Sequence, residues 1–172
     1  MDNSPSIKSI AYTYGLLLAA YSVLVLVLIY AFNISQDNWI IGVVNILVTI
    51  AILALAINNY KSKNNNYLSI KEALKVGLAT AAVGGLVAAI YAYIHYSFVY
   101  PEFIEMVKET SYQNMSDQGM SDKQISDTMK MTEFTMKPWF FSTMTLVSSL
   151  FFGLLISLIT GAILKKQDPA LG

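Results

Sequence analysis

The sequence has no cysteine, no arginine and few charged residues of any kind. The lack of cysteine excludes disulfides, thiol nucleophiles and thiolate metal sites. All eleven basic residues are lysines, so the planar, bidentate recognition of phosphate or carboxylate that arginine provides is missing. The formal net charge is zero, and nothing indicates a nucleic-acid partner. Charged residues make up 13% of the chain, well below the roughly 25% of soluble domains.

The apolar residues, which are 55% of the chain, gather in long blocks rather than in amphipathic stripes. A membrane-spanning helix needs about 20 such residues, so the blocks predict an integral membrane protein. The first block is longer than the core of about 7–15 residues in a signal peptide, and we expect it to stay uncleaved. The expected spans are residues 10–32, 39–57, 70–100 and 139–164.

The third span organises the chain. Ser69 and Glu72 form a capping box, which satisfies backbone amides at a helix start. Pro101 cannot continue a helix, so this one is expected to end at Tyr100. Before the second span, Asp37 or Asn38 is positioned to cap the helix.

Small side chains recur at every fourth residue in two spans, and they let helices approach closely in lipid. In the third span they are Ala73, Gly77, Ala81, Gly85 and Ala89. In the fourth they are Ser149, Gly153, Ser157 and Gly161. Glycine and alanine also simply fill apolar helices, but recurrence in a single register favours packing. We therefore expect the third and fourth spans to pack against each other.

Two groups of polar residues in the spans allow more than one interpretation. Asn45 and Thr49 lie one turn apart in the second span and predict either a transport site or an interhelical hydrogen bond, of which the bond is favoured. His95 is the only histidine, and a proton relay or metal ligand is one interpretation. The favoured one is an interfacial aromatic belt, formed with Tyr91, Tyr93, Tyr96 and Tyr100. We expect no metal and no cofactor.

Residues 101–138 form the only long segment that is not apolar. A break near Ser116–Gly119 separates two expected amphipathic helices, Glu102–Met115 and Asp122–Met136, and Ser121 with Gln124 is a second capping box. Six of the eight methionines lie here. Methionine suits adaptable partner surfaces and can bind copper(I), although packing of the hairpin onto itself and the membrane is the simpler explanation. The candidate partner surface consists of Phe103, Val107, Ile125 and Met129.

The lysines predict the orientation, because short cytoplasmic loops are rich in them. With four spans, one side of the membrane carries seven: Lys8, Lys61, Lys63, Lys71, Lys75, Lys165 and Lys166. The other carries four: Lys108, Lys123, Lys130 and Lys137. Both termini are therefore expected in the cytoplasm, and the hairpin outside with its excess of acidic residues.

A faint internal repeat accompanies this layout. Ser6-Ile7-Lys8 precedes the first span and Ser69-Ile70-Lys71 opens the third. The second and fourth both open with tryptophan and two large apolar residues. A parallel duplication of a two-helix unit is one explanation, and chance similarity between apolar segments is the other.

Three further features carry a resemblance: Lys8 before AYTYGLLLAA, the YAFN turn, and GMSDKQI ahead of the last apolar block. With them the chain resembles domain-of-unknown-function family 4199. The resemblance implies a small four-span bacterial membrane protein. That family has no established activity, so it transfers no functional residues.

Together these features predict an all-α protein, an integral membrane four-helix bundle with an extracytoplasmic amphipathic hairpin between spans three and four. The favoured function is a scaffold or interaction subunit of the bacterial inner membrane, and the alternative is a small oligomeric transporter or channel. An enzyme is not expected, because no span holds a carboxylate or a paired histidine and acid at its centre. The expected partners are the lipid bilayer and a membrane protein or a second copy of the chain.

Overall fold

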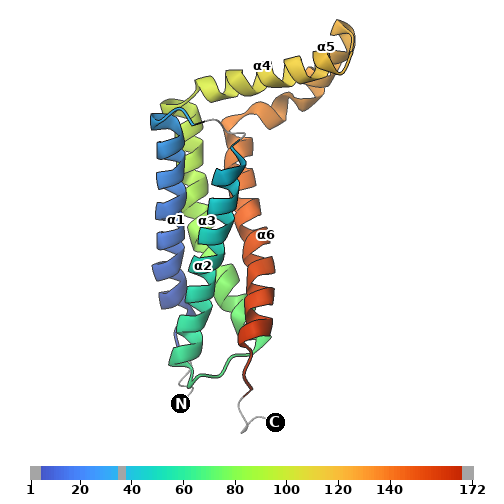
Figure 1. Ribbon diagram of the computed structural model, residues 1–172. Coiled ribbons are helices and arrows are strands. Elements are labelled where there is room, and N and C mark those ends of the chain that lie inside the picture. Colours follow the sequence, from blue (N-terminus) through green and yellow to red (C-terminus); the bar gives the residue numbers. More distant parts are fainter. Residues whose placement is uncertain (1–4, 35–37, 168–172) are drawn as a thin grey trace. The chain divides into compact units, whose positions relative to one another are not determined.

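The computed structural model describes residues 5–34 and 38–167, and this part of the chain is helical (Figure 1). Four helices are long and apolar enough to cross a membrane. They are α1 (Ile7–Ala31), α2 (Trp39–Lys63), α3 (Ile70–Ile94) and α6 (Pro138–Leu164). The prediction of an all-helical chain with four long apolar helices is confirmed. Between α3 and α6 lie η1 (His95–Val99), α4 (Glu102–Asp117), α5 (Asp122–Thr132) and η2 (Glu133–Met136).

The helix starts follow from local capping. The Ser6 hydroxyl accepts a bond of 3.3 Å from the Ser9 amide at the start of α1, and Asn38 caps α2 through the Ile40 amide at 3.1 Å. Asp37, the other predicted cap of α2, lies outside the described residues. At α3 the predicted capping box is present, since Glu72 accepts from the Ser69 amide at 2.8 Å and donates its own amide to the Ser69 hydroxyl at 3.2 Å.

In the long helices, one end differs clearly from the sequence expectation, and another lies where it was expected but with a wider last turn. Helix α2 continues to Lys63, beyond the predicted end at Ile57. The side chain of Tyr60 is buried, and its packing stabilises the additional turn and a half of helix. Helix α3 widens into the π-helical turn η1, in which the Tyr100 amide donates to the His95 carbonyl at 2.7 Å. Pro101 follows at once and prevents the helix from continuing.

The chain divides into two compact units, which are described separately. The long-helix unit comprises the described residues up to Ala88 and from Leu146 onward. The hairpin unit is Ala89–Thr145, which includes the last residues of α3 and the first residues of α6.

In the long-helix unit, α3 contacts α1 and α6 with two different faces, and each face contains a glycine at a close approach. Toward α1, the Gly84 Cα lies so close that an added Cβ would come within 2.9 Å of the Gly15 carbonyl oxygen. Toward α6, a Cβ added at Gly85 would lie 2.6 Å from the Ser149 Cβ. Such distances are shorter than ordinary side-chain contacts, so a side chain at either position requires the helices to move apart.

The small-residue stripes of α3 and α6 meet residue by residue. Gly77 lies against Ser157, and Gly153 lies against Ala81. A Cβ added at Gly161 would lie 2.8 Å from the Ala73 Cβ. The stripe of α3 that was expected to face α6 therefore does so in this unit from Ala73 to Gly85, whereas Ala89 belongs to the hairpin unit.

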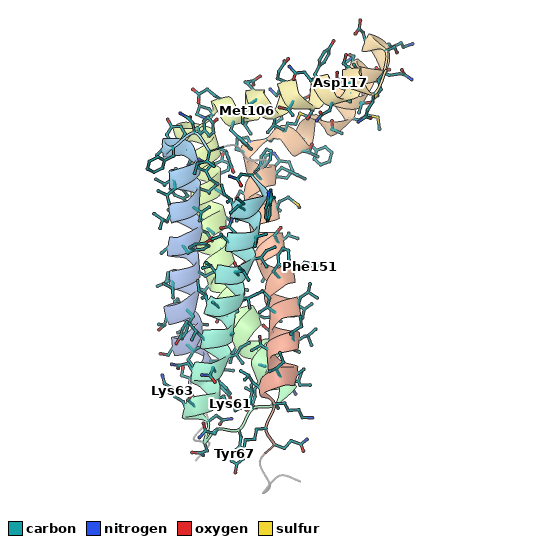
Figure 2. All side chains as sticks on the ribbon, viewed as in Figure 1. Lys61, Lys63, Tyr67, Met106, Asp117 and Phe151 are labelled. Atoms are coloured by element: carbon teal, nitrogen blue, oxygen red, sulfur yellow. The ribbon has the colours of Figure 1, made fainter. Side chains whose placement is uncertain are left out.

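One end of the long-helix unit collects most of the lysines and is called the lysine-rich end. Here Leu68 and Lys166 exchange two backbone hydrogen bonds of 2.9 and 3.0 Å, which join the α2–α3 loop to the chain after α6. Lys61, Lys63 and Tyr67 lie at the same end (Figure 2). The core beneath them is apolar, with Ile10, Ile57, Tyr60, Leu68 and Val76 all buried.

In the hairpin unit, α4 and α5 are separated as predicted by a turn containing Gly119, whose φ is +78°. Glycine adopts this left-handed conformation without strain. Helix α4 extends two residues beyond the predicted Met115, while α5 ends at Thr132 and tightens into η2. The Gln124 side chain accepts from the Ser121 amide at 2.9 Å and closes the second capping box.

The glycine contacts predict that a large side chain lowers the stability of the protein at Gly153 but not at Gly42. Gly153→Leu should lower the free energy of unfolding by about 1–3 kcal/mol or more, because the new side chain has to displace Ala81 of α3. Gly42→Leu is the matched control, since Gly42 has no atom within 4 Å of an added Cβ. Thermal melting in detergent measures both. Equal stability of the two variants would contradict close packing of α3 on α6.

Candidate functional site

The polar pair in the second span does not form a joint site. Asn45 accepts a hydrogen bond of 2.6 Å from the Tyr21 hydroxyl of α1. The Thr49 hydroxyl instead donates to the backbone carbonyl of Asn45 at 2.7 Å, within its own helix. The Asn45 side chain therefore links α2 to α1, which is the interhelical bond that the sequence favoured over a transport site. Tyr21 itself was missed, because nothing in the sequence marks it among the many tyrosines as the partner.

Three further hydroxyls of the long-helix unit donate to backbone carbonyls. Ser149 of α6 donates to the Ala81 carbonyl of α3 at 2.9 Å, and Thr80 donates to Val76 at 2.8 Å. Ser157 donates to the Gly153 carbonyl of its own helix. The acidic and basic side chains of the four long helices lie near the lysine-rich end, and α6 has none. Ser149 thus joins two helices, whereas Thr80 and Ser157 bond within their own.

His95 lies buried in the hairpin unit and is surrounded by tyrosine rings. Its ring centroid is 5.6 Å from that of Tyr91, 5.3 Å from that of Tyr96 and 6.3 Å from that of Tyr100. Tyr93 is exposed, as expected of an interfacial belt, whereas His95 and Tyr96 are interior. The belt interpretation therefore does not describe these two residues. Within the described ranges, no three histidine, aspartate or glutamate side chains gather in a way that could hold a metal ion.

An aromatic cluster fixes α4 to η1 and to the beginning of α6 inside the hairpin unit. Phe103 of α4 stacks on Tyr96 with ring centroids 4.7 Å apart, and it meets Phe141 of α6 edge-on at 5.5 Å. Tyr96 and Phe141 are themselves 5.5 Å apart. Buried aromatic pairs of this geometry contribute about 0.5–1.5 kcal/mol beyond the area that they bury. The sequence analysis singled out Phe103 as a candidate contact residue and Tyr96 as a belt residue, but not their contact with each other or with Phe141 of α6.

The four residues predicted as a partner surface face inward to different degrees. Phe103 and Ile125 are buried, and Val107 and Met129 are half-buried. They form the inner side of the hairpin, which is what a hairpin docked on its own chain requires. The exposed surface is made by other residues.

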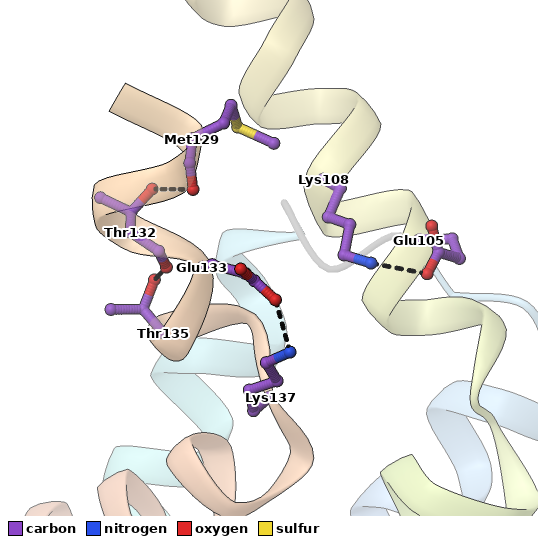
Figure 3. Close-up of polar contacts among 7 residues, drawn as sticks. All are labelled: Glu105, Lys108, Met129, Thr132, Glu133, Thr135 and Lys137. Carbon is purple, nitrogen blue, oxygen red and sulfur yellow. Dashed lines mark hydrogen bonds and ion pairs between the residues drawn. The ribbon is translucent and has the colours of Figure 1, made fainter. Parts of the chain in front are cut away.

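That exposed surface is mostly charged and polar. On α4, Glu102, Glu105 and Glu109 follow one another at helical spacing on the side opposite Phe103 and Val107. Lys108 pairs with Glu105 at 2.8 Å, and Lys137 pairs with Glu133 at 2.7 Å (Figure 3). The hydrogen bond and positive charge of Lys137 lower the pKa of the Glu133 carboxyl, so this residue stays ionised at neutral pH. Met131 and Phe134 are the most exposed apolar side chains of the described hairpin.

The bond between Tyr21 and Asn45 predicts a measurable coupling. In a double-mutant cycle, Tyr21→Phe and Asn45→Ala should be coupled by about 0.6 kcal/mol, and by at most about 1.7 kcal/mol, as polar contacts between helices in membranes are. Unfolding in detergent gives the four stabilities. Tyr12→Phe, at an exposed tyrosine of the same helix, is the control. Independent, additive losses would show that the hydroxyl and the amide do not meet.

Comparison with known proteins gives one match. The model of the family described as protein of unknown function (DUF4199) matches residues 13–166. No curated protein and no solved structure matches the chain. The matched segment includes α2, α3, the hairpin, α6 and all of α1 except its first residues. The resemblance noted in the sequence is confirmed, and the chain belongs to the DUF4199 family.

Proposed function

We propose that the protein is a scaffold or interaction subunit of the bacterial inner membrane, in which the four long helices form a bundle across the bilayer. The observation that carries this proposal is the use of the polar side chains in the long-helix unit. Asn45 and Ser149 bond to neighbouring helices, and Ser157 bonds to its own. Transport sites instead present ionisable or unsatisfied polar groups to a path through the membrane.

The proposed orientation places the lysine-rich end in the cytoplasm. The loop after α2 and the chain after α6 are joined there by the Leu68–Lys166 bridge, and α1 begins beside the same apolar core. Seven of the eleven lysines belong to these short segments and the adjoining helix turns. Short, lysine-rich segments favour retention on the cytoplasmic side. The hairpin between α3 and α6 is then extracytoplasmic.

The contact surface of the proposed scaffold is the acidic side of α4. The inner side of α4 holds Phe103 and Val107. A partner would therefore contact the solvent-facing carboxylates of Glu102, Glu105 and Glu109. A row of carboxylates on a surface helix is often merely solvated. As a contact, it would favour a lysine- or arginine-rich segment and speed its association at low ionic strength.

A small oligomeric transporter or channel is the second candidate. The half-buried Tyr21–Asn45 pair favours it, because a polar pair within two spans can line a path when several copies assemble. The two candidates differ in what Asn45→Ala does. A scaffold loses stability and keeps its partner, whereas a transporter loses flux in reconstituted vesicles.

The orientation is tested with a reporter that is active only in the cytoplasm. Fused after Gly172 it should be active, and inserted beside Gly119 in the α4–α5 turn it should be silent. Gly119 is an exposed turn residue that tolerates insertion better than the helices around it. The reverse pattern would show that the hairpin faces the cytoplasm.

The contact surface is tested by photo-crosslinking in native membranes. A crosslinker at Glu105 and another at Glu109 should capture the same protein, identified by mass spectrometry, and the yield should fall as salt is raised because the attraction is between charges. Leu47, an exposed side chain of α2, is the control position and should capture only lipid or other proteins. Identical captures at all three positions, or none at the two glutamates, would contradict the proposed surface.

A further inference from the structure

Two apolar side chains of the hairpin unit point away from its interior. Met131 is 78% exposed and Phe134 is 53% exposed, while Ile125 and Met136 on the same segment are buried. The two residues are three positions apart in the continuous run of α5 and η2, so they lie on one side of it. They form a small apolar face on a hairpin whose exposed surface is otherwise mostly charged and polar, apart from Met106 and Tyr112 of α4.

This face is continuous with the aromatic end of α6. The Phe134 ring meets the Phe140 ring edge-on at 5.8 Å, and Phe140 meets Trp139 edge-on at 6.0 Å. Trp139 is 49% exposed and stands at the beginning of a helix long and apolar enough to cross a membrane. Exposed tryptophan at such a position sits at the level of the lipid headgroups. Phe134, two ring contacts away, lies within reach of the same layer.

The charges around the face suit a lipid surface. Lys130 and Lys137 are the lysines nearest along the chain, one before and one after the two apolar residues. The intervening Glu133 is paired with Lys137 at 2.7 Å, so these two charges compensate each other and Lys130 supplies the positive charge beside the face. Lysine side chains can extend their apolar stems along such a face and bring the ammonium group to the phosphates. The segment thus combines apolar residues with flanking lysines, as interfacial helices do.

We propose that Met131 and Phe134 insert into the interfacial layer of the bilayer beside Trp139, so that lipid holds the α5–η2 side of the hairpin. A protein partner on this face would have to displace the lipid around Trp139 as well, because the three rings are contiguous. The flexible Met131 side chain adapts to a fluid surface, and the Phe134 ring supplies apolar area. This proposal depends on the chain spanning a membrane and is independent of the scaffold function.

The lack of cysteine in the chain allows a direct test. Met131→Cys and Phe134→Cys, each labelled with an environment-sensitive fluorophore, are reconstituted in vesicles of phosphatidylethanolamine and phosphatidylglycerol. Some vesicles carry acyl chains brominated close to the headgroup. We expect both labels to lose fluorescence in the brominated vesicles, as does a label at the reference position Trp139→Cys. A label at Glu109→Cys, on the exposed side of α4, is the matched control and should keep its fluorescence while remaining open to iodide in the water.

Quenching at positions 131 and 134 no stronger than at 109 would overturn the proposal. The proposal would also be overturned if the protection of these two labels from iodide grew with the protein-to-lipid ratio, because a second copy of the chain would then cover the face. If the labels at positions 131 and 134 were protected from iodide in native membranes but not in pure lipid vesicles, the face would be assigned to a protein partner instead. Both substituted positions are exposed, so the variants should melt like the parent protein. The two positions also test the same face independently.

Discussion

The close approach of α3 to α1 and to α6 is the contact on which the long-helix unit depends. In lipid there is no hydrophobic force to drive apolar helices together, so association depends on close packing and on hydrogen bonds between helices. Helix α3 meets both requirements with Gly84 toward α1 and Gly85 toward α6. The small residues also explain the Ser149–Ala81 bond, because a serine reaches a neighbouring backbone carbonyl only when the two helices nearly touch.

The sequence predicted those features that are local or periodic. The capping boxes at Ser69 and Ser121, the turn at Gly119 and the four long helices depend on a few neighbouring residues or on a simple count of apolar ones. The spacing of the small stripes likewise identified the sides of α3 and α6 that face each other. The polar residues after Ile57 predicted a loop, but α2 continues through them to Lys63 because Tyr60 is buried.

Partners distant in sequence could not be predicted in the same way. Tyr21 is one of eleven tyrosines, and only the structure identifies it as the donor to Asn45. Phe103 was a candidate for the partner surface, and the structure instead packs it against Phe141 of α6. Amphipathicity gave the apolar side of α4 correctly, but it could not distinguish a partner protein from the chain's own helix ends as the surface that covers it. Met131 and Phe134, which the structure leaves exposed, were consequently not identified as a face.

The account as a whole depends on α3 touching α1 and α6 in the observed register, and disulfide cross-linking in native membranes tests that register most directly. A Cβ added at Gly84 would lie 3.1 Å from the Leu18 Cβ, so a slight opening reaches the roughly 3.8 Å of a disulfide. The pairs Leu18→Cys with Gly84→Cys and Ser149→Cys with Gly85→Cys should both cross-link on oxidation. Ser149→Cys with Leu86→Cys, one residue out of register at an exposed position, should not. Cross-linking of the out-of-register pair, or of neither in-register pair, would contradict the account.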